Sequence, residues 1–178
     1  MLRQNQPIYK IRSVSPYEAQ RLADLGRTTF TQAFGADNSP EDFQKYLVEA
    51  FSQDIQTSEL VEPGSVFFIA ESEWEWLGYA RVIPATPPDA SLGVNPLKLQ
   101  RMYVLKQFQG LGAGGRLMEA CLTLAKQNHH DCVWLSVWER NPPAISFYRK
   151  WGFEIEGSLT FIIGSDVQTD HLMVWRNR

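Results

Sequence analysis

A cluster of glycines begins an amphipathic run in the stretch Gln109-Gly110-Leu111-Gly112-Ala113-Gly114-Gly115. Each glycine inside a helix costs about 0.5–1 kcal/mol relative to alanine, so the cluster is a poor way to start a helix. Glycines also let the backbone come close to a ligand, and the unpaired N–H groups at a helix N-terminus attract anions. The stretch therefore predicts an anion-binding loop, in which contacts to a phosphate offset the lost helix propensity.

Three kinds of phosphate-binding loop share this chemistry, and the neighbouring residues separate them. A P-loop requires a Lys-Ser or Lys-Thr pair after its glycines, and none follows here, so a P-loop is rejected. The dinucleotide pattern G-x-G-x-x-G is present in Gly110–Gly115 with Glu139 downstream, but it stands late in the chain and no second βαβ half follows. The third pattern, Q/R-x-x-G-x-G/A after a strand, matches Gln109–Gly114.

A second block of residues follows in the stretch VWLSVWERNPPAISFYRKWGFEIEG. Together with the glycine stretch it resembles the GNAT superfamily, the N-acetyltransferases that use acetyl-coenzyme A (acetyl-CoA). The family's Asn, Ala, Tyr and Gly-Phe pattern falls on Asn141, Ala144, Tyr148, Gly152 and Phe153. Stretches such as NSPEDFQKYLVEAF and GSDVQTDHLM are also similar to the PaiA-type spermidine/spermine acetyltransferases of bacteria.

Helix and strand signals alternate along the chain. Ser15-Pro16-Tyr17-Glu18 and Ser39-Pro40-Glu41-Asp42 each supply an N-cap, a proline at the first helical position and an acid, which predicts two helices in series after the first strand. Two more helices are expected, one after the glycine stretch and one over 142–151. Strands are expected at 8–14, 65–71, 76–83, 97–105, 132–138, 152–159 and 170–176.

This element order predicts an α/β fold in one domain, 1–178, because no boundary or internal repeat interrupts it. The resemblance specifies a GNAT fold. It implies a single mixed, mostly antiparallel central sheet of about seven strands, flanked by about four helices.

The resemblance also assigns a binding site for acetyl-CoA, which acts as co-substrate. The strand before the glycines would pair with the pantetheine arm through its main chain, and the loop N–H groups would hold the pyrophosphate. Tyr148 matches the residue that protonates the departing thiolate. The candidate cofactor-binding residues are Met102, Tyr103, Val104, Gln109, Gly110, Leu111, Gly112, Ala113, Gly114, Gly115, Asn141 and Tyr148.

The acceptor amine needs a route for its proton, because a primary amine with a pKa of about 10.4 is almost wholly protonated at pH 7. Many GNAT relatives place a glutamate on the strand before the loop, but here Lys98 and Gln100 stand where the PaiA-type pattern carries acids. Glu139 is the candidate catalytic base, with Glu71 and Asp170 as further candidates. Transfer of the proton to water is the alternative.

The charge distribution limits the partners. Residues 35–62 hold seven acids against one base, Lys45, which indicates either a solvated helix face or a field that attracts a cationic substrate. Nucleic acid is not expected, because phosphate contacts need clustered Lys and Arg. No apolar run is long enough for a membrane span, and no signal peptide is recognised. A homodimer is left open.

Two cysteines, Cys121 and Cys132, suit a reducing, cytoplasmic location, and neither is expected in the cleft. The three histidines offer no metal-binding spacing, so no metal is expected. The function implied is acetyl transfer to a primary amine of a small molecule, with a polyamine such as spermidine as candidate. The alternatives are an acyl-CoA sensor without efficient catalysis, and acetylation of a peptide N-terminus or an amino-acid-like metabolite.

Overall fold

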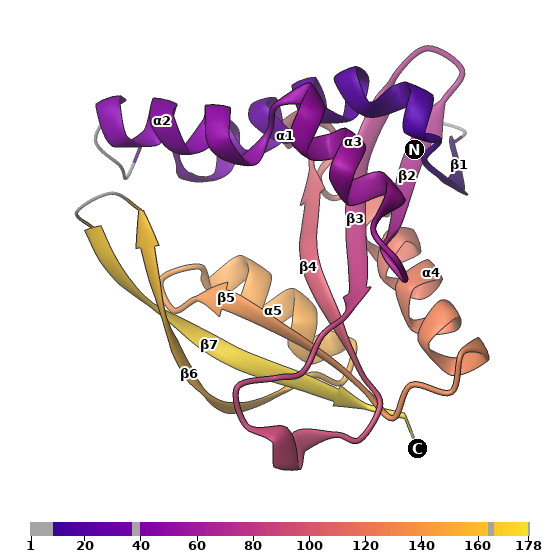
Figure 1. The fold of residues 1–178 in the computed structure, drawn as a ribbon, viewed down its shortest axis with the longest axis vertical. Coiled ribbons are helices and arrows are strands. Elements are labelled where there is room, and N and C mark those ends of the chain that lie inside the picture. The colour runs from indigo at the N-terminus through magenta and orange to yellow at the C-terminus, as the bar shows by residue number, and fades with distance from the viewer. Residues whose placement is uncertain (1–8, 37–39, 164–165, 178) are drawn as a thin grey trace, which may run out of the picture.

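A computed structural model of the chain describes residues 9–36, 40–163 and 166–177. Within these ranges the chain forms one seven-stranded sheet with helices on both faces (Figure 1). The elements are β1 (Tyr9–Ser13), η1 (Pro16–Glu18), α1 (Ala19–Phe34), α2 (Pro40–Ala50), α3 (Gln53–Val61), β2 (Val66–Ser72), β3 (Trp76–Pro84), η2 (Ala90–Leu92), β4 (Pro96–Val104), η3 (Lys106–Phe108), α4 (Ala113–Gln127), β5 (Cys132–Trp138), α5 (Pro142–Lys150), β6 (Glu154–Ile163) and β7 (Asp166–Arg176).

The predicted start of the first helix is confirmed in its capping chemistry. The Ser15 hydroxyl accepts a hydrogen bond from the Tyr17 N–H, and the Glu18 carboxylate accepts one from the Ser15 N–H. The first turn is the short 3₁₀-helix η1, from which α1 continues. The second predicted cap, Ser39, lies outside the described residues, and α2 begins at Pro40 as expected.

One helix, α3, was not predicted. Its apolar side chains do not share a face, because Ile55 and Val61 are exposed and Gln56 is its only buried side chain. Helical periodicity cannot reveal such a segment. The Ser52 hydroxyl starts it by accepting a hydrogen bond from the Ile55 N–H at 3.2 Å, and Gln56 donates to the carbonyl of Ala50 at 3.0 Å. The remaining helices and all seven strands are confirmed, with β6 and β7 longer than predicted.

The strand order is β1-β2-β3-β4-β5-β7-β6, and every neighbouring pair is antiparallel except β4 and β5. The predicted mixed, mostly antiparallel sheet is therefore confirmed. The parallel pair is short: Pro96, Leu97 and Lys98 are partnered by Cys132, Val133 and Trp134, and no further rung follows. Beyond Lys98 the two strands run apart, as Figure 1 shows.

A bulge in β4 lies just beyond the last rung. Arg81 of β3 partners Arg101, but the next residue, Val82, partners Leu99, so Gln100 is an extra residue in β4. The bulge reverses the alternation of side chains. Leu99 and Met102 therefore both pack on the α4 side, whereas Arg101 points to the side occupied by α3.

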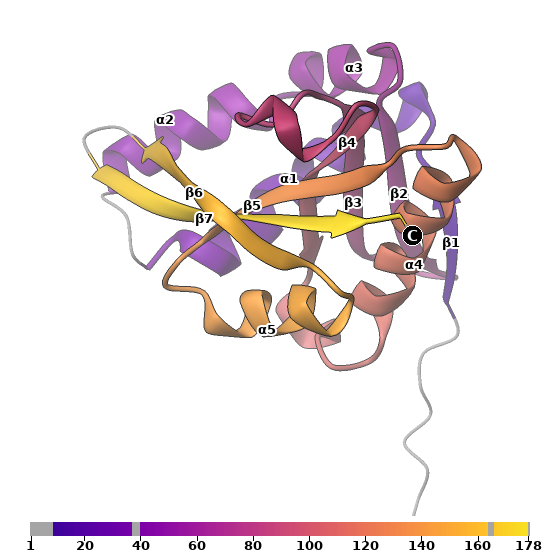
Figure 2. The same cartoon turned by 90° about the horizontal axis from the view of Figure 1, so that it is seen from below.

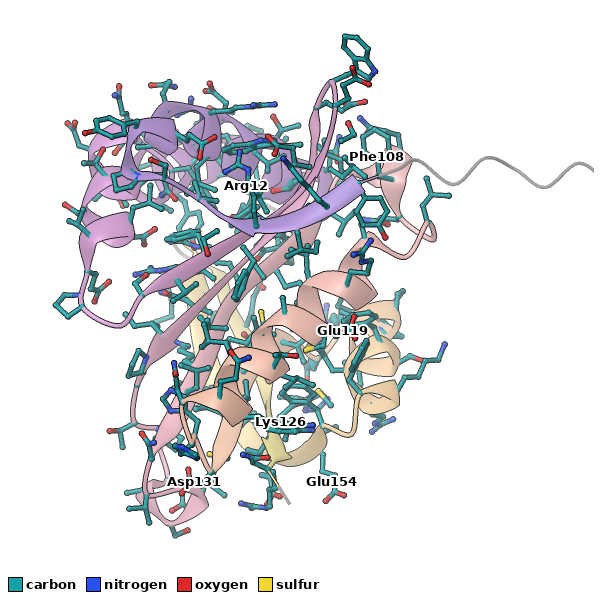
Figure 3. All side chains as sticks on the ribbon, turned by 90° about the vertical axis from the view of Figure 1, so that its right-hand side faces the viewer. Arg12, Phe108, Glu119, Lys126, Asp131 and Glu154 are labelled. Carbon is teal, nitrogen blue, oxygen red and sulfur yellow. The ribbon has the colours of Figure 1, made fainter. Side chains whose placement is uncertain are left out.

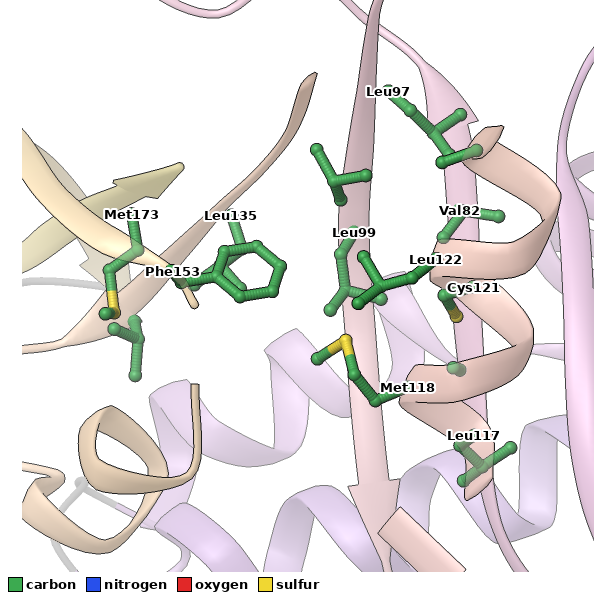
Figure 4. Packing of buried hydrophobic residues seen from close by; sticks show 14 of the residues in the cluster. Val82, Leu97, Leu99, Leu117, Met118, Cys121, Leu122, Leu135, Phe153 and Met173 are labelled. Carbon is green, nitrogen blue, oxygen red and sulfur yellow. The ribbon is translucent and has the colours of Figure 1, made fainter. Parts of the chain in front are cut away.

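Helices cover the two faces of the sheet in separate groups. Viewed from below, α2 and α3 lie on one side and α4 and α5 on the other (Figure 2). The main core lies between the strands and α4, where strand residues such as Val82, Leu97 and Leu99 meet Leu117 and Met118 (Figure 4). This buried layer holds the sheet rigid beside the point where β4 and β5 separate.

Helix α4 is amphipathic, with Leu117 and Cys121 fully buried and Glu119 and Lys126 exposed on its outer side (Figure 3). This is the helix predicted after the glycine stretch, with its apolar face as expected. Among the described residues, no helix combines the length and apolar composition that crossing a membrane would require.

Candidate active site

The divergence of β4 and β5 opens a cleft of about 820 Å³. Its walls come from α1 and α2 on one side, from the glycine stretch and α5 on the other, and from β4, β5 and β7 between them. Ten of the predicted site residues line it: Met102, Tyr103, Val104, Gln109, Gly110, Gly112, Gly114, Gly115, Asn141 and Tyr148. The other three, Leu111, Ala113 and Glu139, are not among the lining residues.

The β4 wall of the cleft offers main-chain groups. Because β5 partners no β4 residue after Lys98, the β5-facing edge of β4 has no strand beside it from Leu99 to Val104. The side chains of Met102 and Val104 pack against the α4-side core. One main-chain group is already used, since the Gln109 side-chain amide donates to the Val104 carbonyl at 3.1 Å. An extended ligand could pair with the rest of this edge as an added strand does.

The glycine stretch forms the turn that leads into α4. Gly110 and Gly112 have φ of 79° and 89°, which residues with a side chain rarely adopt. Gly112 is the N-cap of α4 and supplies no side-chain acceptor, so this fifteen-residue helix begins without a side-chain cap. Its first residues Gly114 and Gly115 line the cleft. The turn is tied to β1, because the Tyr9 hydroxyl donates to the Leu111 carbonyl at 3.4 Å. Leu111 thus contributes to this turn through its main chain, and Ala113 is buried in the main core.

Tyr148 projects from α5 into an aromatic setting. The Asn141 side chain caps α5 by accepting a hydrogen bond from the Ala144 N–H at 3.2 Å. The Tyr148 ring lies edge-on to Phe147 and Phe153, with centroid separations of 5.5 and 5.8 Å. Burial raises the pKa of the Tyr148 phenol above its ordinary value, and Cys121 adds to the shift. The phenol therefore keeps its proton at neutral pH and can donate it.

Neither cysteine is placed to act as a nucleophile. Cys121 and Cys132 are both buried free thiols, and neither lines the cleft. Burial raises the pKa of Cys121 above its ordinary value and that of Cys132 to about 11. The reactive thiolate is thus disfavoured at both positions, which favours direct transfer over an acyl-enzyme.

The three candidate bases lie in very different places. Glu139 is exposed at the end of β5 and does not line the cleft. Glu71 lies on β2 against Arg12, with Nε–Oε2 at 2.7 Å, and this hydrogen bond lowers the pKa of Glu71 to about 2. Asp170 of β7 lines the cleft and is 7% exposed. Burial raises the pKa of Asp170, against the lowering effects of the Ser136 hydroxyl and of His171.

The acidic segment before β2 is partly neutralised by arginines of the sheet. Glu59 of α3 accepts from Arg101 at 2.6 and 2.9 Å and contacts Arg81 at 2.7 Å, and Glu62 pairs with Arg81 as well. The sequence could not show that these two acids pair with arginines of the sheet, because α3 itself was not predicted. Lys98 points into the same cleft, and its pKa is lowered by burial and then by Arg81 and Arg101.

Comparison with known proteins agrees with this geometry. The family model described as "Acetyltransferase (GNAT) family" matches residues 22–153. An uncharacterized N-acetyltransferase of Lactobacillus delbrueckii subsp. lactis is 33% identical over 92% of this chain and 95% of its own length. The spermine/spermidine N(1)-acetyltransferase of Bacillus subtilis (strain 168) is 33% identical over only 35% of this chain and 42% of its own length.

Among solved structures, the PaiA N-acetyltransferase of Thermoplasma acidophilum in complex with coenzyme A has a similar fold. It superposes with a TM-score of 0.78 at 20% identity, covering 96% of this chain and 99% of that chain. At that identity the likeness concerns the fold, and the match of the family model covers most of the chain independently. The chain therefore belongs to the GNAT family of N-acetyltransferases.

Proposed function

We propose that this protein transfers the acetyl group of acetyl-CoA to the primary amine of a small molecule by direct attack within a ternary complex. The observation that carries the proposal is the cleft where β4 and β5 separate. It brings an unpaired strand edge, an uncapped helix N-terminus and the Tyr148 phenol to one cavity.

Acetyl-CoA would lie along the β4 side of this cleft. Its pantetheine arm would pair with the main chain around Met102 and Val104, and its pyrophosphate would rest on the N–H groups at the start of α4. The carbonyl oxygen of the Asn141 side chain already caps α5, so its amide nitrogen is the part that can donate to the cofactor. The coenzyme A complex of the Thermoplasma protein, which shares the fold, supports this choice of ligand.

Tyr148 would act on the leaving group. The amine nitrogen bonds to the thioester carbonyl carbon, the C–S bond breaks, and the Tyr148 hydroxyl gives its proton to the thiolate of coenzyme A. A phenol that stays protonated at neutral pH suits this role, and solvent can reprotonate it afterwards.

The acceptor is a primary amine, with spermidine as the polyamine to test first. Support comes from the aromatic wall formed by Phe34, Tyr46 and Trp138, which suits an organic cation, and from the name of the Bacillus subtilis relative. A second candidate is an amino-acid-like amine or a peptide N-terminus. Lys98 favours it, because an ammonium inside the cleft attracts a carboxylate and repels a polycation.

The test is release of coenzyme A from acetyl-CoA with a panel containing spermidine, simple monoamines, amino acids and short peptides. A control without amine measures background from the protein's own thiols, and calorimetry measures acetyl-CoA binding in the same sample. Saturable, amine-dependent release supports acetyl transfer. Tight binding of acetyl-CoA without release for any amine would overturn it in favour of an acyl-CoA sensor.

A further inference from the structure

Asp170 is the only carboxylate among the described residues that line the cleft. The other acids near the sheet are used elsewhere, since Glu59 and Glu62 pair with arginines and Glu71 pairs with Arg12. Asp170 is 7% exposed, and no salt bridge involves it within the part of the chain that the structure describes. A buried carboxylate without a cation is costly, so this arrangement suits a site whose cation arrives with the ligand.

The sheet register places Asp170 on the side of the cleft that faces α1 and α2. Asp170 is opposite Trp138 of β5, and the alternate β7 residues Leu172 and Val174 pack with Trp134 on that same face. Ser136 lies on this same face of β5, opposite Leu172, and its hydroxyl lowers the pKa of the Asp170 carboxyl.

An aromatic pair closes the cleft beside this position. The rings of Phe34 on α1 and Trp138 on β5 are 6.4 Å apart, edge to face, and both residues line the cleft. Tyr148 lies across the cleft on α5, and the open edge of β4 runs between the two sides. Asp170 and Tyr148 thus face the cleft from opposite sides. This arrangement suits acyl transfer, in which the base acts on the attacking amine and the acid acts on the departing thiolate.

We propose that Asp170 binds the ammonium group of the acceptor and takes its proton before attack. This inference rests on the proposed acetyl transfer and names its missing base. The ammonium loses one proton to the Asp170 carboxylate, and the neutral amine attacks the thioester carbon as the C–S bond breaks. The product amide nitrogen loses its second proton to water, and Asp170 returns its own to solvent after product release.

The pH profile separates this role from a structural one. The other titratable residues that line the cleft are Lys98, Arg101 and Tyr103 of β4, Tyr46 of α2, and Tyr148 and Lys150 of α5, and His171 follows Asp170 in β7. None of them is a carboxylate. In the wild type, kcat/KM requires Asp170 ionised and the amine protonated, so it forms a plateau between the two pKa values. Without a base only free amine reacts, and kcat/KM rises about tenfold per pH unit toward pH 10.

The experiment compares Asp170→Asn, Asp170→Glu and Glu139→Gln, with Glu73→Gln in the exposed β2–β3 turn as matched control. The amine is whichever one the wild type acetylates. We expect Asp170→Asn to lower kcat/KM at pH 7 by about 10²–10⁴-fold and to leave the affinity for acetyl-CoA unchanged. The kcat/KM of this variant should rise about tenfold per pH unit, as it does without a base. Asp170→Glu should restore part of the loss, and the Glu73 and Glu139 variants should match the wild type.

Asp170→Asn activity equal to the wild type, or a loss with Glu139→Gln instead, would overturn the proposal. If the wild type acetylates no amine, calorimetry measures the binding of spermidine to the protein saturated with coenzyme A instead. Binding by the wild type that is lost in Asp170→Asn would then support the ammonium site while the acetyl-transfer proposal fails. Equal binding to both, or binding to neither, would overturn the site.

Discussion

Lys98 and Trp134 are the last register partners of β4 and β5, and the Lys98 ammonium lies 4.6 Å from the centroid of the Trp134 ring. Lys98 lines the cleft beside the last β4–β5 rung and brings a positive charge to it. No salt bridge joins Lys98 to a carboxylate among the residues described, and its pKa is lowered by burial and then by Arg81 and Arg101. We therefore expect the choice of acceptor to depend on this one side chain.

Replacing Lys98 by methionine removes that charge while keeping the apolar stem against Trp134. We expect KM for spermidine to fall by roughly tenfold, because one unit charge at about 10 Å in a partly screened cleft contributes about 1–2 kcal/mol. KM for an amino-acid-like acceptor should rise. Steady-state kinetics with both acceptors measures the two changes, and a parallel change in both would show that Lys98 acts through packing alone.

The Tyr148 phenol is tested by Tyr148→Phe. The ring and its contacts with Phe147 and Phe153 stay, so acetyl-CoA affinity should be unchanged while kcat falls by about 10²-fold. Calorimetry and single-turnover kinetics separate the two quantities. Full turnover by the variant would remove Tyr148 from the chemistry.

The anion site at the start of α4 is tested at Gly114. A side chain there would meet Phe147 at an ordinary 3.7 Å, and the position has no positive φ, so Gly114→Ala should bind acetyl-CoA normally. Gly114→Asp puts a carboxylate where the pyrophosphate is expected, and we expect about 100-fold weaker binding. The helix itself should tolerate the acid near its N-terminus. Equal affinity in both variants would mean that the phosphates lie elsewhere.

Stability at acid pH should depend on the Arg12 cluster. Arg12 bonds Glu71 and Glu18, and these hydrogen bonds lower the pKa of both carboxylates, that of Glu71 from 4.5 to about 2. A carboxylate with a lowered folded-state pKa contributes its stability above pH 4.5 and loses it as pH falls toward 2. Arg12→Met should therefore lower the free energy of unfolding at pH 7 by roughly 2 kcal/mol. The further loss of stability as pH falls from 4.5 toward 2 should then be smaller than in the wild type. Urea unfolding at several pH values measures both changes. The same loss of stability at acid pH in the variant and the wild type would contradict this prediction.

The Glu59 carboxylate joins α3 to the sheet through two arginines, of which Arg81 is 2% exposed. Glu59→Gln removes the negative charge that both guanidinium groups contact. We expect a loss of about 2–3 kcal/mol in unfolding free energy. Glu49→Gln, on an exposed position of α2, is the matched control and should be neutral. Similar midpoints of the unfolding transition in the two variants would mean that other contacts hold α3 against the sheet.

Much of the fold follows from local chemistry. The Ser15 capping box, the glycine turn before α4 and the apolar faces of α1 and α4 are each encoded in a few neighbouring residues. The α3 helix was missed because Ser52, Gln56 and Glu59 stabilise it through polar contacts, which leave no apolar periodicity.

The cleft required the three-dimensional structure. Two features of the cleft depend on the register between strands: the position at which β4 and β5 separate, and the extra residue Gln100 in β4. The sequence of one strand does not specify its register with another strand. Asp170 and Glu139 look equivalent along the chain, because Asp170 begins one predicted strand and Glu139 directly follows another. The antiparallel β5–β7 pairing puts Asp170 inside the cleft and leaves Glu139 on the surface.

Among the described residues, the three rungs between β4 and β5 are the only strand pairing that joins two half-sheets, β1–β4 and β5–β7. A ligand that pairs with one half and contacts the other bridges them as an extra strand. Such a ligand at 100 times its Kd adds about 2.7 kcal/mol to the stability of the folded state. The melting temperature of this protein should then rise with the concentration of acetyl-CoA around it.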